Sequence, residues 1–273
     1  MFGVLTVHLG EELSHSRRAL LRLRPATGTE YREDLFRMAM FATVQVTLCP
    51  GWSDSLRQKR VRAGLQWLRA KGARRVVLPE EWHGLTRELE LAPIGAEGAL
   101  EACGAQAIAE ACGSMGLPMG QVCLAVYGRR ISHSASMQIL TLAKSLRTVR
   151  IYGEGNEELR TRLWRSCGIV DRGPMPENAP VVGLLLPGGE ARGETLLTVD
   201  LSGGTGAGEG LLWTPQPLPP QGVLAKLPLG ADPTAFANAF LQAGALQARE
   251  IHVSRLDIPD CTQYNKETVE KCF

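Results

Sequence analysis

Residues 122–153, VCLAVYGRRISHSASMQILTLAKSLRTVRIYG, decide the fold class of this chain of 273 residues. An apolar run over 122–127 ends at Gly128, a polar turn follows, and a segment with helical periodicity leads to a second apolar run over 149–152. Two apolar strands joined by a helix are typical of a parallel β-α-β unit. Ligands of such units usually bind where the first strand runs into the helix. The stretch therefore predicts both an architecture and the place of a pocket.

The overall composition is that of an ordinary globular protein, with 44% hydrophobic and 21% charged residues. No apolar run approaches the roughly 18 residues that a membrane-spanning helix needs. The N-terminus, MFGVLTVHLGEEL, lacks the basic start and long apolar core of a signal peptide. We therefore expect a cytoplasmic protein that does not enter a membrane.

The seven cysteines are an odd number, and none has C-x-x-C spacing, so the sequence favours neither a disulfide framework nor a zinc knuckle. The spacing of Cys103 and Cys112 predicts opposite faces of one helix. Cys123 and Cys167 lie in apolar patterns and are expected to be buried. Cys261 and Cys272 lie in the polar tail and are expected to be accessible.

The net charge is only +2, but basic residues are concentrated before residue 76. They are Arg17, Arg18, Arg22, Arg24, Arg57, Lys59, Arg60, Arg62, Arg69, Lys71, Arg74 and Arg75. A nucleic acid or another anionic partner is one interpretation. Because no aromatic interleaving or known reader motif accompanies these charges, the pattern favours a solvated helix face instead.

The residues before the central stretch predict a smaller N-terminal α/β part. Its expected elements are strands at 2–9, 42–49 and 75–78 and a helix from a cap at Ser53 or Asp54 to residue 70. Residues 80–98 are expected to be an irregular connection, and residues 99–115 a helix rich in small side chains. The predicted boundaries are therefore an N-terminal part over 1–98 and a second domain over 99–273, with 99–120 as the connecting helix.

The second domain is predicted to continue the alternation of strands and helices. Its expected strands lie at 122–127, 149–152, 181–186, 196–201 and 251–253, and its helices at 134–146, 156–168 and 234–248, with a proline-rich loop at 213–222. The fold class that follows is α/β, Rossmann-like, with a mostly parallel sheet in the C-terminal half.

The turn after the first strand of this domain is the leading candidate site. The start of the next helix offers unpaired backbone N–H groups and a partial positive charge, which favour an anion. We expect Gly128, Arg129, Arg130, Ser132 and Ser134 to form a cradle for a phosphate or carboxylate. The alternative is that a serine only caps the helix while both arginines face water.

Further candidates follow the next strands. Glu154 is placed to hydrogen-bond the ribose of a nucleotide, or else to interact with the dipole of the helix that it precedes. The glycine clusters at 187–189 and 202–206, with Asp200 before the second, are either binding loops or surface turns. The five histidines have no metal-ligand spacing, so no metal site is predicted.

Residues 99–201 resemble the Rossmann-type NAD(P)-binding domain of amino-acid and shikimate dehydrogenase-like enzymes. That family carries a G-x-G-x-x-G turn, in which Gly128 matches the first glycine. Arg130 and His133 occupy the second and third glycine positions, where a side chain crowds the pyrophosphate and hinders helix packing. The resemblance therefore implies the fold more directly than it implies NAD(P) as a cofactor.

Three functions remain open from the sequence. The first is a protein that binds an anionic small molecule or nucleotide without conventional NAD chemistry. The second is an NAD(P)-dependent oxidoreductase with an atypical turn, in which Glu154 contacts the ribose. The third is a non-catalytic protein that binds another protein or a second copy of itself, with the loop 213–222 and the basic face over 57–75 as contact surfaces. The sequence does not settle whether the protein is an enzyme.

Overall fold

The computed structural model describes residues 1–273 apart from 11–28, 172–175, 177–178, 192–194, 203–210 and 254–273. Contacts between Cα atoms divide the chain into two compact units. The first contains Met1–Ala96 together with Pro219–Glu250, and the second contains Glu97–Leu218 together with the residues from Ile251 onward. The sequence placed 99–273 in one domain, whereas Pro219–Glu250 groups with the first unit. The reason is that its helix carries phenylalanines that pack on the first sheet.

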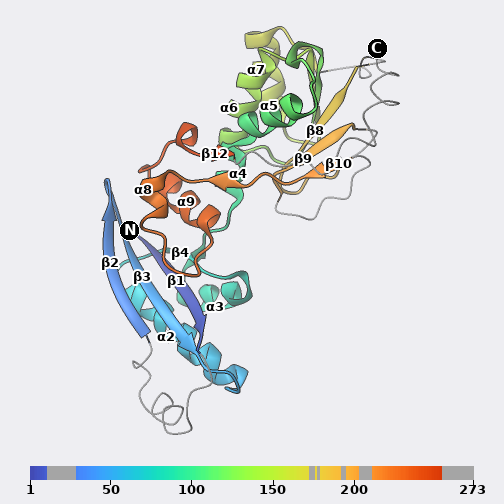
Figure 1. The fold of residues 1–273 in the computed structure, drawn as a ribbon. Helices are drawn as coiled ribbons and strands as arrows, with labels where there is room; N and C mark the ends of the chain where they lie inside the picture. Colours follow the sequence, from blue (N-terminus) through green and yellow to red (C-terminus); the bar gives the residue numbers. More distant parts are fainter. Residues whose placement is uncertain (11–28, 172–175, 177–178, 192–194, 203–210, 254–273) are drawn as a thin grey trace. The chain divides into compact units, whose positions relative to one another are not determined.

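The first unit is built on a five-stranded sheet of order β2-β3-β1-β4-β5 (Figure 1). The strands are β1 (Phe2–Leu9), β2 (Thr29–Phe36), β3 (Ala39–Leu48), β4 (Arg75–Val77) and β5 (Ala92–Pro93). All are parallel except β2, which forms an antiparallel hairpin with β3. The predicted strands β1, β3 and β4 are confirmed. The edge strand β2 was not predicted because its sequence, TEYREDLF, is mostly charged and polar.

Helix α2 (Asp54–Ala70) covers one face of this sheet, and its predicted bounds are confirmed. Gly64 lets the helix approach closely, since a Cβ there would lie 3.1 Å from side-chain atoms of both Leu5 and Val44. Alternation along the strands sends the neighbouring residues to the other face. There, Phe2 and Phe41 pack against Phe236 and Phe240 of helix α9 (Pro233–Gln242), with ring centroids 5.1–6.2 Å apart.

Short elements complete the first unit. They are η1 (Glu80–Trp82), α3 (His83–Thr86), η2 (Arg87–Leu89), α8 (Gln221–Leu224) and η4 (Ala248–Glu250). The connection predicted for 80–98 is therefore a series of single helical turns followed by β5. Asn238 joins α9 to this region, because its side-chain amide donates to the Gly95 carbonyl at 2.8 Å.

The second unit is a five-stranded parallel sheet of order β10-β9-β8-β6-β7. Its strands are β6 (Cys123–Tyr127), β7 (Thr148–Tyr152), β8 (Val181–Leu185), β9 (Leu197–Asp200) and β10 (Leu211–Trp213). Its helices are α4 (Glu97–Ala102), α5 (Gly104–Ser114), α6 (His133–Ala143) and α7 (Glu157–Cys167), with η3 (Met119–Gln121) before β6. Figure 1 shows α5, α6 and α7 grouped beside this sheet. The α/β, Rossmann-like class with a mostly parallel sheet is confirmed.

Strands β11 (Pro217–Leu218) and β12 (His252–Val253) pair antiparallel and form a separate two-stranded sheet. Within the described residues, no helix is long and apolar enough to cross a membrane.

The helix predicted over 99–115 is in fact two helices, α4 and α5, which break at Cys103. Gly104 begins the second helix, where a Cβ would lie 3.1 Å from Leu201. Cys103 directly precedes α5 and Cys112 lies within it, and both are buried. Burial raises the pKa of the Cys103 thiol to about 12 and that of Cys112 to about 11. Both are therefore unreactive thiols at neutral pH.

The other predicted cysteine positions are only partly covered by the structure. Cys123 is buried, as predicted, and Cys167 is half-buried on α7. Cys261 and Cys272 lie outside the described residues.

Candidate ligand-binding turn at the carboxyl edge of the parallel sheet

The strand order of the second unit places a topological switch point at β6. From this strand the chain passes through α6 to β7 on one side, whereas β8 pairs with the other side of β6. The register puts Tyr127 opposite Tyr152 and Leu185, so β6, β7 and β8 end level with one another. In open parallel sheets, ligands bind in the crevice outside such carboxyl ends.

Three glycine-containing turns meet at this edge. A Cβ added to Gly153 would lie 2.2 Å from the carbonyl oxygen of Gly128, and one added to Gly189 would lie 2.3 Å from that of Tyr127. Gly153 also has a positive φ of 130°. No side chain fits at either position, so the turns after β7 and β8 pack directly on the backbone that leaves β6. The predicted cluster at 187–189 thus belongs to the same edge as the Gly128 turn.

The Asn156 side chain holds the turn after β6 through two hydrogen bonds. Its side chain is 5% exposed, donates to the Gly128 carbonyl at 3.1 Å, and accepts from the Ile131 N–H at 3.2 Å. The sequence predicted Asn156 as the cap of the following helix. It does precede α7, but its side chain makes no capping bond and is used instead to hold the neighbouring turn.

Ser132 caps α6, as the alternative to ligand contact predicts. Its hydroxyl oxygen accepts from the Ala135 N–H at 3.1 Å and donates its proton to the Glu101 carboxylate at 2.5 Å. Burial raises the pKa of Glu101, while the Ser132 bond lowers it and the charge of Glu97 raises it further. Ser132 therefore has no proton left to donate to a bound anion.

The two arginines of the turn face solvent. Arg129 and Arg130 are exposed, and neither forms an ion pair with any residue that the structure describes. Arg129 lies beside the turn that follows β8, since a Cβ added to Gly188 would be 3.8 Å from the Cβ of Arg129. Ser134, in the first turn of α6, is half-buried. The turn thus carries two uncompensated positive charges at the start of a helix.

Glu154 lies in the turn between β7 and α7, directly after Gly153. Its side chain is exposed and has no hydrogen-bond or ionic partner within the described part of the chain. The structure therefore places Glu154 beside the backbone that follows β6, on the glycine-containing edge.

A cavity of about 170 Å³ lies between the amino ends of α6 and α7. It is lined by Ile131, His133, Ser136, Gly155, Asn156, Glu158, Leu159 and Arg162. Two helix amino ends together present partial positive charge. Arg162 adds a full charge, although it is paired with Glu158 at 2.5 Å.

The turn does not fit the pyrophosphate cradle of a bound dinucleotide. The backbone N–H of Gly128 donates to the Tyr152 carbonyl at 3.1 Å, and those of Ile131 and Ala135 are taken by the Asn156 and Ser132 side chains. In a three-glycine turn the backbone itself approaches the phosphates. Here three of these backbone donors are already used, and Arg130 stands at the second glycine position, where its side chain crowds the pyrophosphate.

Asp200 is fully buried at the end of β9. One carboxylate oxygen accepts from the N–H and the hydroxyl of Ser202, at 2.8 and 2.5 Å, and the other has no hydrogen-bond partner within the described part of the chain. Of the predicted glycine cluster that follows, residues 203–206 lie outside the described residues. Across the described ranges, no group of three or more histidine, cysteine or acidic side chains is arranged to hold a metal ion.

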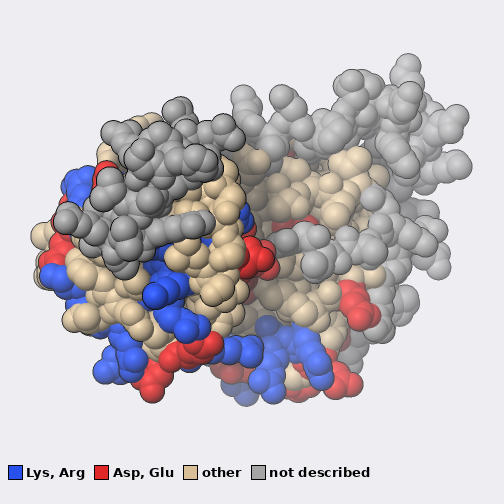
Figure 2. Space-filling model, turned by 90° about the horizontal axis from the view of Figure 1, so that it is seen from below, with Lys and Arg blue, Asp and Glu red and all other residues tan. Residues whose placement is uncertain are grey.

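Three of the eight basic side chains predicted over 57–75 are paired with acids. Arg62 pairs with Glu88 at 2.6 Å, Lys71 pairs with Glu33 at 2.5 Å, and Arg69 pairs with Glu90. Figure 2 shows basic and acidic side chains intermingled over the face that it presents. The predicted basic residues Arg17, Arg18, Arg22 and Arg24 lie outside the described residues. A solvated face with local ion pairs describes α2 better than a surface of one sign.

No protein-family model and no curated protein matches this sequence. A search of solved structures finds L-tryptophan dehydrogenase from Nostoc punctiforme, with 9% sequence identity and a TM-score of 0.29. The match covers 77% of this chain and 64% of that one, so it spans less than two thirds of the dehydrogenase chain. A similarity of this size carries no argument about fold or activity. The fold class rests on the strand order and register described above.

Proposed function

We propose that the second unit binds a small anionic molecule or a nucleotide at the carboxyl edge of its sheet, without conventional NAD chemistry. The observation that carries this proposal is the pair of exposed arginines, Arg129 and Arg130, which have no acidic partner among the described residues. They lie at the end of β6, where the strand order reverses, and at the start of an 11-residue helix.

Each predicted site residue then has a role that fits its place. Gly128 lets the backbone after β6 pass close to Leu186, because a Cβ on residue 128 would lie 3.2 Å from the Leu186 Cβ. Arg129 and Arg130 supply charge-assisted donors to phosphate or carboxylate oxygens. Ser134 supplies a hydroxyl from the first turn of α6. Ser132 acts indirectly, since its capping bond fixes where the helix begins.

Glu154 is proposed to accept from a hydroxyl of the ligand, as a ribose would offer. An exposed acid near two arginines also disfavours a second phosphate at that point, because like charges repel. The proposal therefore favours a nucleoside monophosphate or a phosphorylated small molecule over a dinucleotide.

The test is calorimetric titration of the full chain with inorganic phosphate, AMP, ATP, NADH and NADPH at low and high salt. We expect a phosphate-bearing probe to bind, and the double variant Arg129→Ala with Arg130→Ala to weaken it at least about tenfold, since two charge-assisted bonds are lost. The matched control removes Lys144 and Arg147, two exposed basic residues away from the carboxyl edge of the sheet.

The outcomes separate the three functions. If the control variant weakens binding as much as the double arginine variant does, the effect comes from net charge alone and the proposed site is wrong. Tight binding of NADH or NADPH that is lost in Glu154→Ala would favour the oxidoreductase instead. Failure of every probe to bind would overturn anion binding and leave the partner-binding function.

A further inference from the structure

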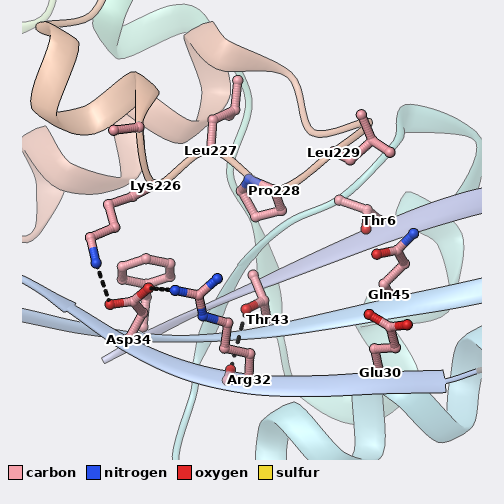
Figure 3. A pocket seen from close by; sticks show the side chains of 12 residues that line it. Thr6, Glu30, Arg32, Asp34, Thr43, Gln45, Lys226, Leu227, Pro228 and Leu229 are labelled. Carbon is pink, nitrogen blue, oxygen red and sulfur yellow. Dashed lines mark hydrogen bonds and ion pairs between the residues drawn. The ribbon is translucent and has the colours of Figure 1, made fainter.

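A second polar pocket lies in the first unit, on the sheet face opposite α2 (Figure 3). Its volume is about 240 Å³, many times the roughly 10–15 Å³ that a cavity needs to hold one water molecule. Its floor is formed by side chains of β1, β2 and β3, and the segment 225–229 lies over it (Figure 3). The proposed function uses none of these residues.

One row of the floor is set by strand register. Glu30 of β2 is opposite Gln45 of β3, and Gln45 is opposite Thr6 of β1. A carboxylate, an amide and a hydroxyl therefore follow one another across three neighbouring strands on the same face, and Figure 3 shows them in this order. Because the strands lie about 4.8 Å apart, these groups are spaced to contact one small molecule together.

The Thr6 hydroxyl opens into this pocket. The residue is only 1% exposed and lines the pocket, and its hydroxyl has no hydrogen-bond partner among the described residues. Because this oxygen is not one of the fully enclosed atoms that lack a partner, it stays accessible to a molecule in the cavity. Glu30 and Gln45 likewise make no side-chain bond with any described residue. A row of three polar groups with unused hydrogen-bonding capacity is thus aimed into one cavity.

The charges of the pocket favour a neutral ligand. Asp34 pairs with both Arg32 and Lys226, each at 2.8 Å, and these bonds lower the pKa of its carboxyl group. Together with Glu30, the pocket holds two basic and two acidic side chains and is balanced. An anion would have to displace Asp34 from its partners, and a cation at Glu30 would lie near Arg32.

The hydrogen-bonding groups and the apolar side chains of the pocket favour a ligand rich in hydroxyl groups. Thr43 donates its proton to the Arg32 carbonyl at 3.2 Å, so its oxygen offers only acceptor capacity to the pocket. The floor therefore offers both acceptors and donors, since Arg32 and Lys226 keep N–H groups that Asp34 does not use. Leu227, Pro228 and Leu229 give the opposite side an apolar surface. A sugar ring or cyclic polyol has hydroxyls at its edge and C–H groups on its face, which matches this division.

We propose that the pocket under 225–229 binds a small neutral polyol or monosaccharide, through the row formed by Glu30, Gln45 and Thr6. The ligand hydroxyls donate to the carboxylate and accept from the amide, and the C–H face of the ring packs on Pro228. This site is independent of the anion site of the second unit.

The test is NMR titration of the full chain with glucose, galactose, ribose and myo-inositol, with putrescine and acetate as charged probes. We expect a neutral probe to give saturable shifts in amides of β1, β2 and β3 near the row. Thr6→Val and Glu30→Gln should each weaken that probe about tenfold, by loss of a buried hydrogen bond or of an ionised acceptor. Glu33→Gln, on the opposite face of β2, should not.

Thr6→Val should keep the thermal midpoint of the native chain, because the hydroxyl it removes has no partner in the protein. If that variant does not fold, Glu30→Gln carries the test, since Glu30 is exposed. Saturable binding of putrescine or acetate with no response to any neutral probe would overturn the proposal. So would a neutral probe that binds equally well to Thr6→Val and Glu30→Gln.

Discussion

Asn156→Ala is the substitution that most directly tests the geometry of the carboxyl edge. The side chain makes two hydrogen bonds, one to the Gly128 carbonyl and one from the Ile131 N–H, and both span more than twenty positions of sequence. A hydrogen bond contributes about 0.5–1.5 kcal/mol, and a buried group left without a partner costs about 1–3 kcal/mol. Since Gly128 is buried, we expect a loss of about 2–4 kcal/mol in the stability of this edge.

Hydrogen exchange measured by mass spectrometry is the suitable assay, because it resolves the two units separately. Amides of β6 and β7 should exchange about thirtyfold faster or more, as 2 kcal/mol corresponds to a factor of about thirty. Amides of the first unit should be unchanged. Asn156→Asp is the matched variant, since it keeps the shape and the acceptor but cannot donate to Gly128, and it should also lose about 2 kcal/mol. Unchanged exchange in Asn156→Asp would refute the bond from Asn156 to Gly128 and its role in holding the turn after β6.

Two further predictions follow from the same edge. Gly153→Ala places a Cβ 2.2 Å from a backbone oxygen at a φ of 130°, and its free energy of unfolding in urea should fall by at least about 3 kcal/mol. The control Gly168→Ala has a φ of 68° and no atom within 4 Å of the added Cβ, so it should lose only about 1 kcal/mol. Equal losses in the two variants would contradict the packing of the turns. Burial raises the pKa of Glu101 in the folded protein, so the folded state keeps this proton to a higher pH than the unfolded state does. The free energy of unfolding therefore falls as the pH rises above the pKa of an unfolded glutamate, about 4.3. Glu101→Gln cannot titrate, and its urea midpoint should fall less than that of the native chain between about pH 4 and pH 7; parallel curves would contradict the shift.

Much of the secondary structure could be predicted because it depends on local patterns. The bounds of α2 follow from a capping position at Ser53 and helical periodicity up to Ala70. The end of α7 follows from Gly168, whose φ of 68° few other residues adopt. The strand β2 could not be predicted in this way, since an edge strand with charged residues on its faces lacks the apolar alternation that identifies a buried strand.

The candidate site was predicted in part. Its position after β6 followed from the β-α-β pattern, and the exposure of Arg129 and Arg130 fits the predicted turn. The partners of that turn could not be predicted. Asn156 has the sequence signature of a helix cap, and only the close approach of the turns after β6 and β7 explains why it bonds to Gly128 instead. Glu101 gave no signal at all, because it lies on a separate helix, thirty-one positions before Ser132.

The sequence by itself determined most of the strands and helices, and that the strands of the second unit are parallel. These properties depend on hydrophobic periodicity and short connections, which each segment carries within itself. Only the tertiary structure decided that Pro219–Glu250 groups with the first unit, that Gly153 and Gly189 lie against the end of β6, and that Glu30, Gln45 and Thr6 form one row. The physical reason is the same in each case. Register, close backbone approach and shared cavities join residues that are distant in the chain, and no local pattern records which distant residue will be the neighbour.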